Sequence, residues 1–336
     1  TITSMVMHVL KSLGLTFDYL VGAQIDGFET MVGLSNHSEI AVFEGDEYLS
    51  SALDGRPKFH LYRPHIGGIS GIAWDHANVF PTPDVYRRQF SQFVESFEPG
   101  GQLIYFGEDP EVSTIAASTR EDLETLSYET HPYEVYDGQF RLLTRTASIP
   151  VQVFGQHNMQ NIAAAKVVCL QLGVSTDDFY SSISSFKGAA RRLEAIYEGQ
   201  DSSIFLDFAH SPSKVSATTA AVKELFPERR LVACLELHTF SSLSPEFIKE
   251  YRSSLDKADE PIVFFDPEAV RHKRLPPLTK ALVEEAFANQ RLLVFADKDE
   301  LLKHFSSKSW KNTNLLLMSS GSFSGIDVTS LVQTLM

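Results

Sequence analysis

The chain has 336 residues, of which 43% are hydrophobic and 21% are charged, as is typical of a soluble globular protein with large cores. Its net charge of −14 argues against nonspecific nucleic-acid binding, although a local arginine cluster or a metal would still attract a small anion. No apolar run approaches the roughly 20 residues of a membrane span. Both cysteines, Cys169 and Cys234, lie in apolar runs, so we expect buried reduced thiols and a cytosolic protein.

The first part of the sequence alternates expected helices and strands. Apolar residues on one helical face, followed by Gly14, predict a helix over residues 2–13. We then expect strands at 17–22, 39–44 and 102–106, and another strand that ends near Trp74. A helix is expected at 85–97. This alternation predicts a mostly parallel sheet. Helices in such domains usually follow a strand and a turn, so we expect the sequence to begin inside a motif.

The pattern changes over residues 124–154 and restarts near residue 203. Short alternating runs with the pair Asp137-Gly138 predict antiparallel hairpins at a sheet edge. Helices are expected at 158–172 and 177–186, and later strands at 203–207, 230–236, 262–266, 291–295 and 314–319. The length and the restart predict two α/β domains, residues 1–187 and 188–336.

The most informative turn is Asp207-Phe208-Ala209-His210-Ser211-Pro212, between an apolar strand and a helix expected over 214–225. An acid and an imidazole three residues apart, on the turn that leaves a parallel strand, lie where open α/β sheets bind ligands. The alternative is that Asp207 caps the helix and His210 is a surface residue.

Acidic and imidazole side chains follow two earlier expected strands. Glu44-Gly45-Asp46-Glu47 follows one, and Trp74-Asp75-His76 ends the other. If these strands are parallel neighbours, Glu44 and His76 converge at one sheet edge, where a carboxylate, an imidazole and water suit a Mg²⁺ that also holds nucleotide phosphates. The alternative is a solvated acidic turn and a capping Asp-His pair.

Asn158 and Asn161 share a face in the first turn of an expected helix. Their amides both donate and accept hydrogen bonds, as the edge of an adenine requires. The alternative is that Asn158 caps the helix and Asn161 is exposed.

Other candidates precede or follow strands of the second expected domain. The pair Arg191-Arg192 comes just before a strand, and its planar guanidiniums suit phosphate, although such pairs are often surface features. His238 follows the strand at 230–236. The small-residue loop over 319–325 opens a helix and suits contact with an anion.

Taken in order, these segments make nearly the whole chain similar to the ATP-dependent Mur ligases of peptidoglycan synthesis. The resemblance implies a central P-loop-type ATPase domain and a C-terminal Rossmann-like α/β domain, with the phosphate loop and a UDP-binding domain lying before residue 1. It implies ATP and Mg²⁺ as cofactors. The implied ligands are Glu44 and His76 for Mg²⁺, Asn158 and Asn161 for adenine, and Arg192 and Asp207 for phosphate and ribose.

The resemblance also implies a reaction, in which the carboxylate of UDP-N-acetylmuramate is activated as an acyl phosphate and attacked by an amine. Glu44, His76 and His210 are the implied catalytic residues, and the implied contacts to the amine substrate are His238, Ser320, Gly321 and Phe323. Residues 43–48, 75–80 and 320–326 look most like the branch that takes the tripeptide L-alanyl-γ-D-glutamyl-meso-diaminopimelate. Alternatives are L-alanine as the amine, a nucleotide-binding pseudo-ligase without turnover, and a folylpolyglutamate synthase-like ligase.

Overall fold

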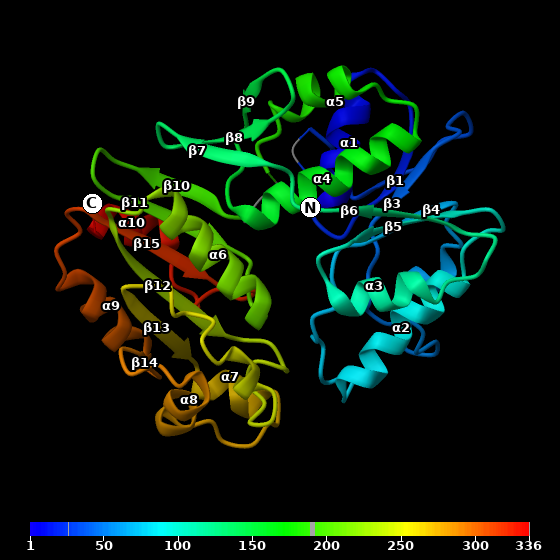
Figure 1. Ribbon diagram of the computed structural model, residues 1–336. Helices are drawn as coiled ribbons and strands as arrows, with labels where there is room; N and C mark the ends of the chain where they lie inside the picture. Colours follow the sequence, from blue (N-terminus) through cyan, green and yellow to red (C-terminus); the bar gives the residue numbers. More distant parts are fainter. Residues whose placement is uncertain (26, 189–191, 336) are drawn as a thin grey trace. The chain divides into compact units, whose positions relative to one another are not determined.

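The computed structural model describes residues 1–25, 27–188 and 192–335. The chain divides into two units, the first made of Thr1–Trp74 and Pro81–Ala190, and the second of Asp75–Phe80 and Arg191–Met336 (Figure 1). The short segment Asp75–Phe80 therefore lies with the second unit, although the chain on both sides of it belongs to the first. In the described part of the chain, no helix is long and apolar enough to cross a membrane.

The first unit begins with helix α1, Ile2–Ser12, which confirms the helix expected there. Its apolar side is buried and packs against helices α4, Gln156–Gln171, and α5, Thr176–Ile183. Gly14, just past the helix, has a φ of +70°, a left-handed conformation that favours glycine and ends the helix.

Two small sheets follow in the first unit. Strand β1 lies between β2, which is antiparallel to it, and β3, which is parallel; their bounds are Asp18–Leu20, Val32–Gly33 and Ala41–Phe43. The second sheet is parallel, in the order β4-β5-β6, with bounds Ile66–Ile69, Gln102–Phe106 and Glu124–Tyr128. Strand β2 has only two residues and was not expected from the sequence.

Helices α2, Pro83–Glu95, and α3, Pro110–Ala117, belong to the layer beside the parallel sheet, together with the 3-10 turn η1, Lys58–Leu61. A cluster of aromatic and aliphatic side chains joins them to the sheet. Gly67 of β4 is needed for this packing, because a Cβ there would lie 2.3 Å from Cζ of Phe97.

The expectation of a strand ending near Trp74 is wrong, because β4 ends at Ile69. Its ladder with β5 stops at the pair Ile69↔Tyr105, so the next five residues have no strand partner and form a loop. In the described residues β3 and β4 also belong to different sheets. The premise that Glu44 and His76 follow neighbouring parallel strands is therefore not met.

Residues 124–154 are only partly the antiparallel hairpins that were expected. Strand β6 extends the parallel sheet, because the preceding helix α3 returns the chain to that edge. Strands β7, β8 and β9 form a separate antiparallel sheet, with bounds Tyr133–Tyr136, Gln139–Leu143 and Ser148–Pro150, and residues 151–154 form no strand. The Asp137-Gly138 turn is confirmed, with φ values of 51° and 70°.

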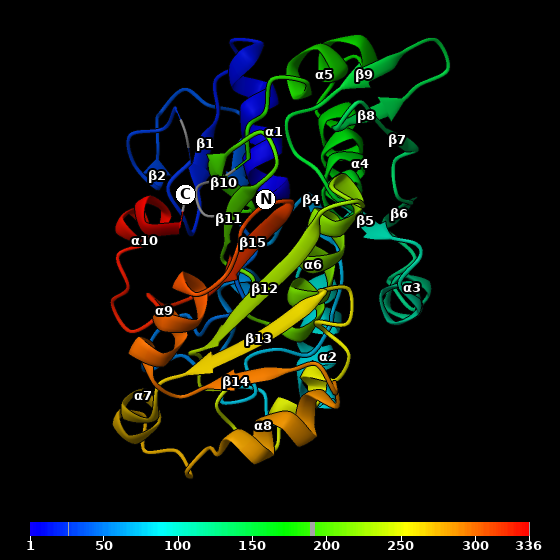
Figure 2. The ribbon, with the colours of Figure 1, turned by 90° about the vertical axis from the view of Figure 1, so that its left-hand side faces the viewer.

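The second unit is built on one six-stranded sheet in the order β10-β11-β15-β12-β13-β14 (Figure 2). All pairs are parallel except the edge pair of β10 with β11. The bounds are Glu194–Glu198, Ser203–Asp207, Arg230–Leu237, Glu260–Phe265, Leu293–Phe295 and Thr313–Met318, taken from β10 to β15. The five strands expected from residue 203 onward are confirmed, because continuous apolar runs specify buried parallel strands.

In the described residues of the second unit, five helices and one 3-10 turn accompany the sheet. They are α6, Pro212–Leu225; η2, Ile248–Tyr251; α7, Pro267–His272; α8, Lys280–Phe287; α9, Lys298–Ser306; and α10, Val328–Leu335. Strand β15 lies between β11 and β12, so chain order switches there. In open α/β sheets, ligands bind beyond the carboxyl ends of the strands at such a switch.

Both cysteines are free and buried, as expected: Cys169 lies on α4 and Cys234 on β12. Burial raises the pKa of Cys169 to about 12 and that of Cys234 well above its usual range. Both thiols therefore stay protonated and act as small apolar core groups.

Candidate active site

Asp207 is the last residue of β11 and is buried. Its Oδ2 accepts a 2.6 Å hydrogen bond from the hydroxyl of Thr218 on α6. The N-cap of α6 is Ser211, and Pro212 occupies the first helical turn. The alternative that Asp207 caps this helix is therefore wrong, and its carboxylate belongs to the carboxyl edge of the sheet.

His210 lies in the turn between β11 and α6, and its side chain is 12% exposed, so it is not a surface residue. Its Nδ1 donates a 2.8 Å hydrogen bond to the carbonyl of Phe208, and its own carbonyl accepts one from the hydroxyl of Tyr251. Burial lowers the pKa of His210, and the nearby charge of Lys214 lowers it further. The ring is thus held neutral at pH 7, with Nε2 as its unprotonated nitrogen.

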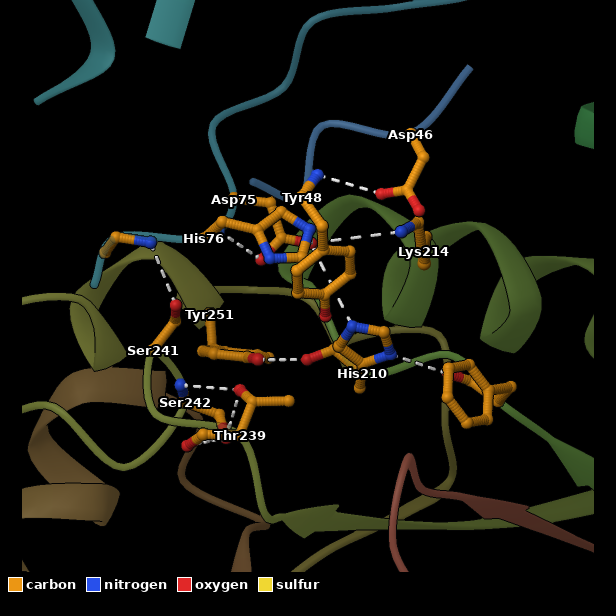
Figure 3. Close-up of polar contacts among 12 residues, drawn as sticks. Asp46, Tyr48, Asp75, His76, His210, Lys214, Thr239, Ser241, Ser242 and Tyr251 are labelled. Carbon is orange, nitrogen blue, oxygen red and sulfur yellow. Dashed lines mark hydrogen bonds and ion pairs between the residues drawn. The ribbon is translucent and has the colours of Figure 1, made fainter. Parts of the chain in front are cut away.

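Asp75 lies close to this turn within the same unit (Figure 3). Its Oδ1 accepts a 2.7 Å hydrogen bond from the backbone N–H of His76. Its Oδ2 is buried without a hydrogen bond among the described residues. That oxygen lies 3.8 Å from Nζ of Lys214 and 4.0 Å from Nε2 of both His76 and His210.

A hydrogen bond to the second unit helps to hold the Asp75–Phe80 segment in this position. The backbone N–H of Ala77 donates a 3.0 Å hydrogen bond to the buried hydroxyl of Ser241. His76 has a left-handed φ of 54°, a conformation that costs free energy for a residue with a Cβ and persists only where the surroundings hold it. The predicted site residues His76 and His210 thus lie around one carboxylate, together with Lys214, which was not among the predicted residues.

Arg192 is exposed, and its guanidinium carbon lies 5.5 Å from the ring centroid of Phe208. This cation–π contact places the guanidinium beside the turn that carries Asp207 and His210. Arg191, the other member of the predicted pair, lies outside the described residues.

His238 and the 319–325 loop follow the neighbouring strands β12 and β15. Nδ1 of His238 lies 3.8 Å from Oε1 of Glu236, a buried residue of β12. Ser320 and Gly321 are half-buried, whereas Phe323 is buried and stacks on Phe264 in the core. The Phe323 ring therefore anchors the loop.

Three of the predicted site residues belong to the first unit. Glu44 follows β3, and its Oε2 accepts a 2.6 Å hydrogen bond from the backbone N–H of Gly22. Asn158 and Asn161 lie in the first two turns of α4, joined by a 3.4 Å hydrogen bond from Nδ2 of Asn161 to Oδ1 of Asn158. The N-cap of α4 is Gly155, so the alternative that Asn158 caps it is wrong.

The donor groups fit a magnesium ion carried by a nucleotide better than a preformed metal cage. Among the residues that the structure describes, no group of three or more His, Cys, Asp or Glu side chains could hold a metal. Mg²⁺ usually takes one or two carboxylates and completes its shell with water and phosphate oxygens. The unbonded Oδ2 of Asp75 and the adjacent imidazole of His76 suit such a partial site. A Mg²⁺ bound by both Glu44 and His76 stays a prediction.

Comparison with known proteins gives two domain matches that together cover most of the sequence. Residues 1–169 match the Mur ligase middle domain, and residues 191–321 match the glutamate ligase domain of Mur ligases.

The chain is similar to curated ligases whose names specify different amine substrates. It is 29% identical over 314 residues to the UDP-N-acetylmuramate–L-alanine ligase of Arthrobacter sp. (strain FB24), covering 88% of the chain and 64% of that protein. It is 26% identical over 345 residues to the UDP-N-acetylmuramate–L-alanyl-γ-D-glutamyl-meso-2,6-diaminoheptandioate ligase of Haemophilus influenzae, covering 97% of the chain and 72% of that protein. The chain thus spans about 64% of the length of the Arthrobacter relative.

A solved structure has the same fold. The crystal structure of a murein peptide ligase from Psychrobacter arcticus superposes with a TM-score of 0.66 at 22% identity, covering 99% of this chain and 74% of that one.

Proposed function

Since the chain belongs to the Mur ligase family, we propose that this protein is an ATP-dependent ligase that joins the carboxylate of UDP-N-acetylmuramate to an amine. The observation that carries this proposal is the cluster around Asp75, where His76, His210 and Lys214 surround one buried carboxylate oxygen. Among the described residues, this cluster brings one lysine ammonium and two imidazoles together and includes no serine. Phosphoryl transfer needs charge neutralisation and positioning more than a protein nucleophile.

We assign ATP and Mg²⁺ to the residues whose chemistry suits them. Glu44 and His76 would hold Mg²⁺, which when bound with ATP would neutralise phosphate charge. Asn158 and Asn161 would contact the adenine, Asp207 the ribose, and Arg192 a phosphate. In this assignment the ribose would contact Oδ1 of Asp207, because Oδ2 already accepts the hydrogen bond from Thr218.

The proposed role of His210 is to accept a proton from the attacking amine. Its Nδ1–H is held by the carbonyl of Phe208, so Nε2 is the nitrogen left to accept a proton. Because burial lowers its pKa, the ring is neutral at pH 7 and ready for that role. Lys214 would stabilise the acyl phosphate and the phosphate that leaves. His238 and the loop with Ser320, Gly321 and Phe323 would position the amine substrate.

We propose the tripeptide L-alanyl-γ-D-glutamyl-meso-diaminopimelate as the amine substrate, on the strength of residues 43–48, 75–80 and 320–326. The similarity to the Haemophilus ligase, whose name specifies this acceptor, supports the choice. L-alanine is the second candidate, because the Arthrobacter relative is named for it.

The test measures ADP release by the full-length protein with ATP and UDP-N-acetylmuramate, offering either L-alanine or the tripeptide. Turnover with the tripeptide alone supports the proposal, and turnover with L-alanine alone replaces it with the second candidate. No turnover with either amine favours a nucleotide-binding pseudo-ligase.

Two histidine variants link turnover to the site. His210→Gln should abolish most turnover. His304→Gln is the matched control, because His304 binds Glu260 at the start of β13, away from the carboxyl edge of the same sheet, and its loss should leave turnover unchanged.

A further inference from the structure

Glu236 is a buried carboxylate to which the proposed reaction assigns no role. It is 2% exposed and lies near the carboxyl end of β12, between Leu235 and Leu237 in an apolar strand. An ionised carboxylate in such a place is strongly disfavoured unless hydrogen-bond donors surround it. Its partners therefore identify what it stabilises.

The donors to Glu236 come from the loop that follows the adjacent strand β15. Oε2 accepts hydrogen bonds from the hydroxyl of Ser319 and, at 2.7 Å, from the backbone N–H of Phe323. The same Ser319 hydroxyl accepts a 2.7 Å hydrogen bond from the N–H of Gly321. One carboxylate oxygen thus holds the loop backbone directly at Phe323 and, through the Ser319 hydroxyl, at Gly321.

This loop has a backbone conformation that needs such support. Phe323 and Ser324 have φ values of 49° and 52°, and Gly325 follows at 78°. Two consecutive side-chain-bearing residues in the left-handed region persist only where their surroundings hold them there. Besides Glu236, the stacking of Phe323 on Phe264 and a 2.7 Å hydrogen bond from Ser324 to Asp266 supply that support.

His238 is joined to the same loop by close packing. A Cβ added at Gly321 would lie 2.7 Å from Cγ of His238 and 3.0 Å from Oε2 of Glu236. Only a glycine leaves room for the imidazole to lie against the loop backbone. The carboxylate, the imidazole and the loop therefore form one packed cluster.

We propose that Glu236 is a positioning residue that holds the 319–325 loop and His238 in the geometry that binds the amine substrate. The inference rests on the proposed function, which places the amine at His238 and this loop. Glu236 contacts no reacting atom and acts through the loop. Its loss should therefore weaken binding of the amine much more than binding of ATP. Among the described residues assigned to ATP, Asp207 meets this loop through its backbone carbonyl, which accepts a 2.9 Å hydrogen bond from the N–H of Ser319, and its carboxylate is held separately by Thr218.

The first measurement does not depend on turnover. Hydrogen–deuterium exchange of the full-length protein should show faster exchange at the Phe323 amide in Glu236→Gln than in the unaltered protein. The neutral amide accepts more weakly than a carboxylate and directs an N–H group to one side. Exchange along β12 and β15 should stay slow. Unchanged exchange at Phe323 would overturn the inference, whether or not the protein is a ligase.

The second measurement compares the KM for the amine with the KM for ATP. Glu236→Gln should raise the KM for the amine about tenfold, as expected for weakening a hydrogen bond to a charged group, with the KM for ATP within about twofold. Equal rises in both KM values would indicate a merely structural role and overturn the proposal. Glu260→Gln is the matched control, since Glu260 is a buried carboxylate at the start of neighbouring β13, and its variant should leave both KM values unchanged.

A second variant covers the case in which Glu236→Gln does not fold. Gly321→Ala changes the same contact from the loop side, so it should also raise the KM for the amine and speed exchange at Phe323. A fully active Gly321→Ala with unchanged exchange would count against the inference. Absence of turnover in the unaltered protein would refute the proposed function, and the exchange experiment would still decide the role of Glu236.

Discussion

Nζ of Lys214 lies 3.8 Å from Oδ2 of Asp75, and this ion pair joins helix α6 to the segment Asp75–Phe80. The carboxylate side chain is only 10% exposed, whereas the lysine side chain is 48% exposed. Oδ2 of Asp75 has no hydrogen bond among the described residues. The Lys214 ammonium is therefore important to this buried oxygen as a nearby positive charge.

Replacing Lys214 by Met should lower the free energy of unfolding of the second unit by about 1 kcal/mol. This loss lies between those expected for breaking an exposed ion pair and a fully buried one. Lys280→Met is the matched control, because Lys280 is also 48% exposed but pairs with an exposed carboxylate, Glu300, so it should cost only a few tenths of a kcal/mol. Denaturant unfolding followed by the fluorescence of the buried Trp310 in a Trp74→Phe background measures both. Equal losses would show that the pair of Lys214 with Asp75 contributes no more to stability than an exposed ion pair.

Much of the fold could be predicted from the sequence because apolar runs and helix caps are local signals. The buried strands of the second unit follow directly from such runs. The loop before Asp75 could not be predicted this way, because the end of β4 is set by where its ladder with β5 stops. The same limit explains β6, since alternation within a strand does not reveal whether its partner is parallel or antiparallel.

Residues of the candidate site could be predicted where an uncommon residue type follows an expected strand. They could not be predicted where the role of a residue depends on a contact with a distant part of the sequence. His76 and His210 stand out as imidazoles next to strand ends. Lys214 gave a weaker signal, a cation in the first turn of a helix, where the helix dipole disfavours it. Glu236 gave another, an acid inside an apolar strand, but its role depends on a loop far along the sequence.

Replacing Thr218 by Val should destabilise the second unit by about 1–3 kcal/mol, because it removes a donor from the buried carboxylate of Asp207. If Asp207 holds the ribose, the KM for ATP should rise as well. The neighbouring Thr219→Val is the control, since the buried Thr219 hydroxyl bonds the carbonyl of Val215 within the helix, and its loss should cost under about 0.5 kcal/mol. Indistinguishable losses in the two variants would contradict the importance of the Asp207 contact.

Replacing Ser241 by Ala should loosen the segment Asp75–Phe80, because the N–H of Ala77 loses its acceptor. Hydrogen–deuterium exchange at Ala77 should speed up, and the stability of the second unit should fall by about 1 kcal/mol. Ser254→Ala is a suitable control, because the buried Ser254 hydroxyl has no hydrogen bond among the described residues, so its removal should be neutral. Unchanged exchange at Ala77 would show that other contacts hold the segment.

His131 makes the stability of the first unit depend on pH. Its Nδ1 donates a 2.8 Å hydrogen bond to the carbonyl of Pro132, and its Nε2 accepts one of 2.7 Å from the hydroxyl of Tyr180. The Tyr180 oxygen in turn accepts a 2.9 Å hydrogen bond from Lys166. Burial lowers the pKa of His131 below its usual value of about 6.5, and the charge of Lys166 lowers it further. This network therefore requires a neutral imidazole.

The sign of the pH effect follows from that lowered pKa. Below about pH 6.5 the unfolded chain binds a proton at His131 that the folded unit does not. The stabilisation is thus complete above that pH and is lost as pH falls, at no more than about 1.4 kcal/mol per pH unit. Denaturant unfolding from pH 7.5 to 5, followed by Trp74 fluorescence in a Trp310→Phe background, should show a smaller slope for His131→Gln than for the parent. His37→Gln changes an exposed histidine and should keep the parental slope. Identical slopes for His131→Gln and its parent would show that the imidazole is not held neutral by the fold.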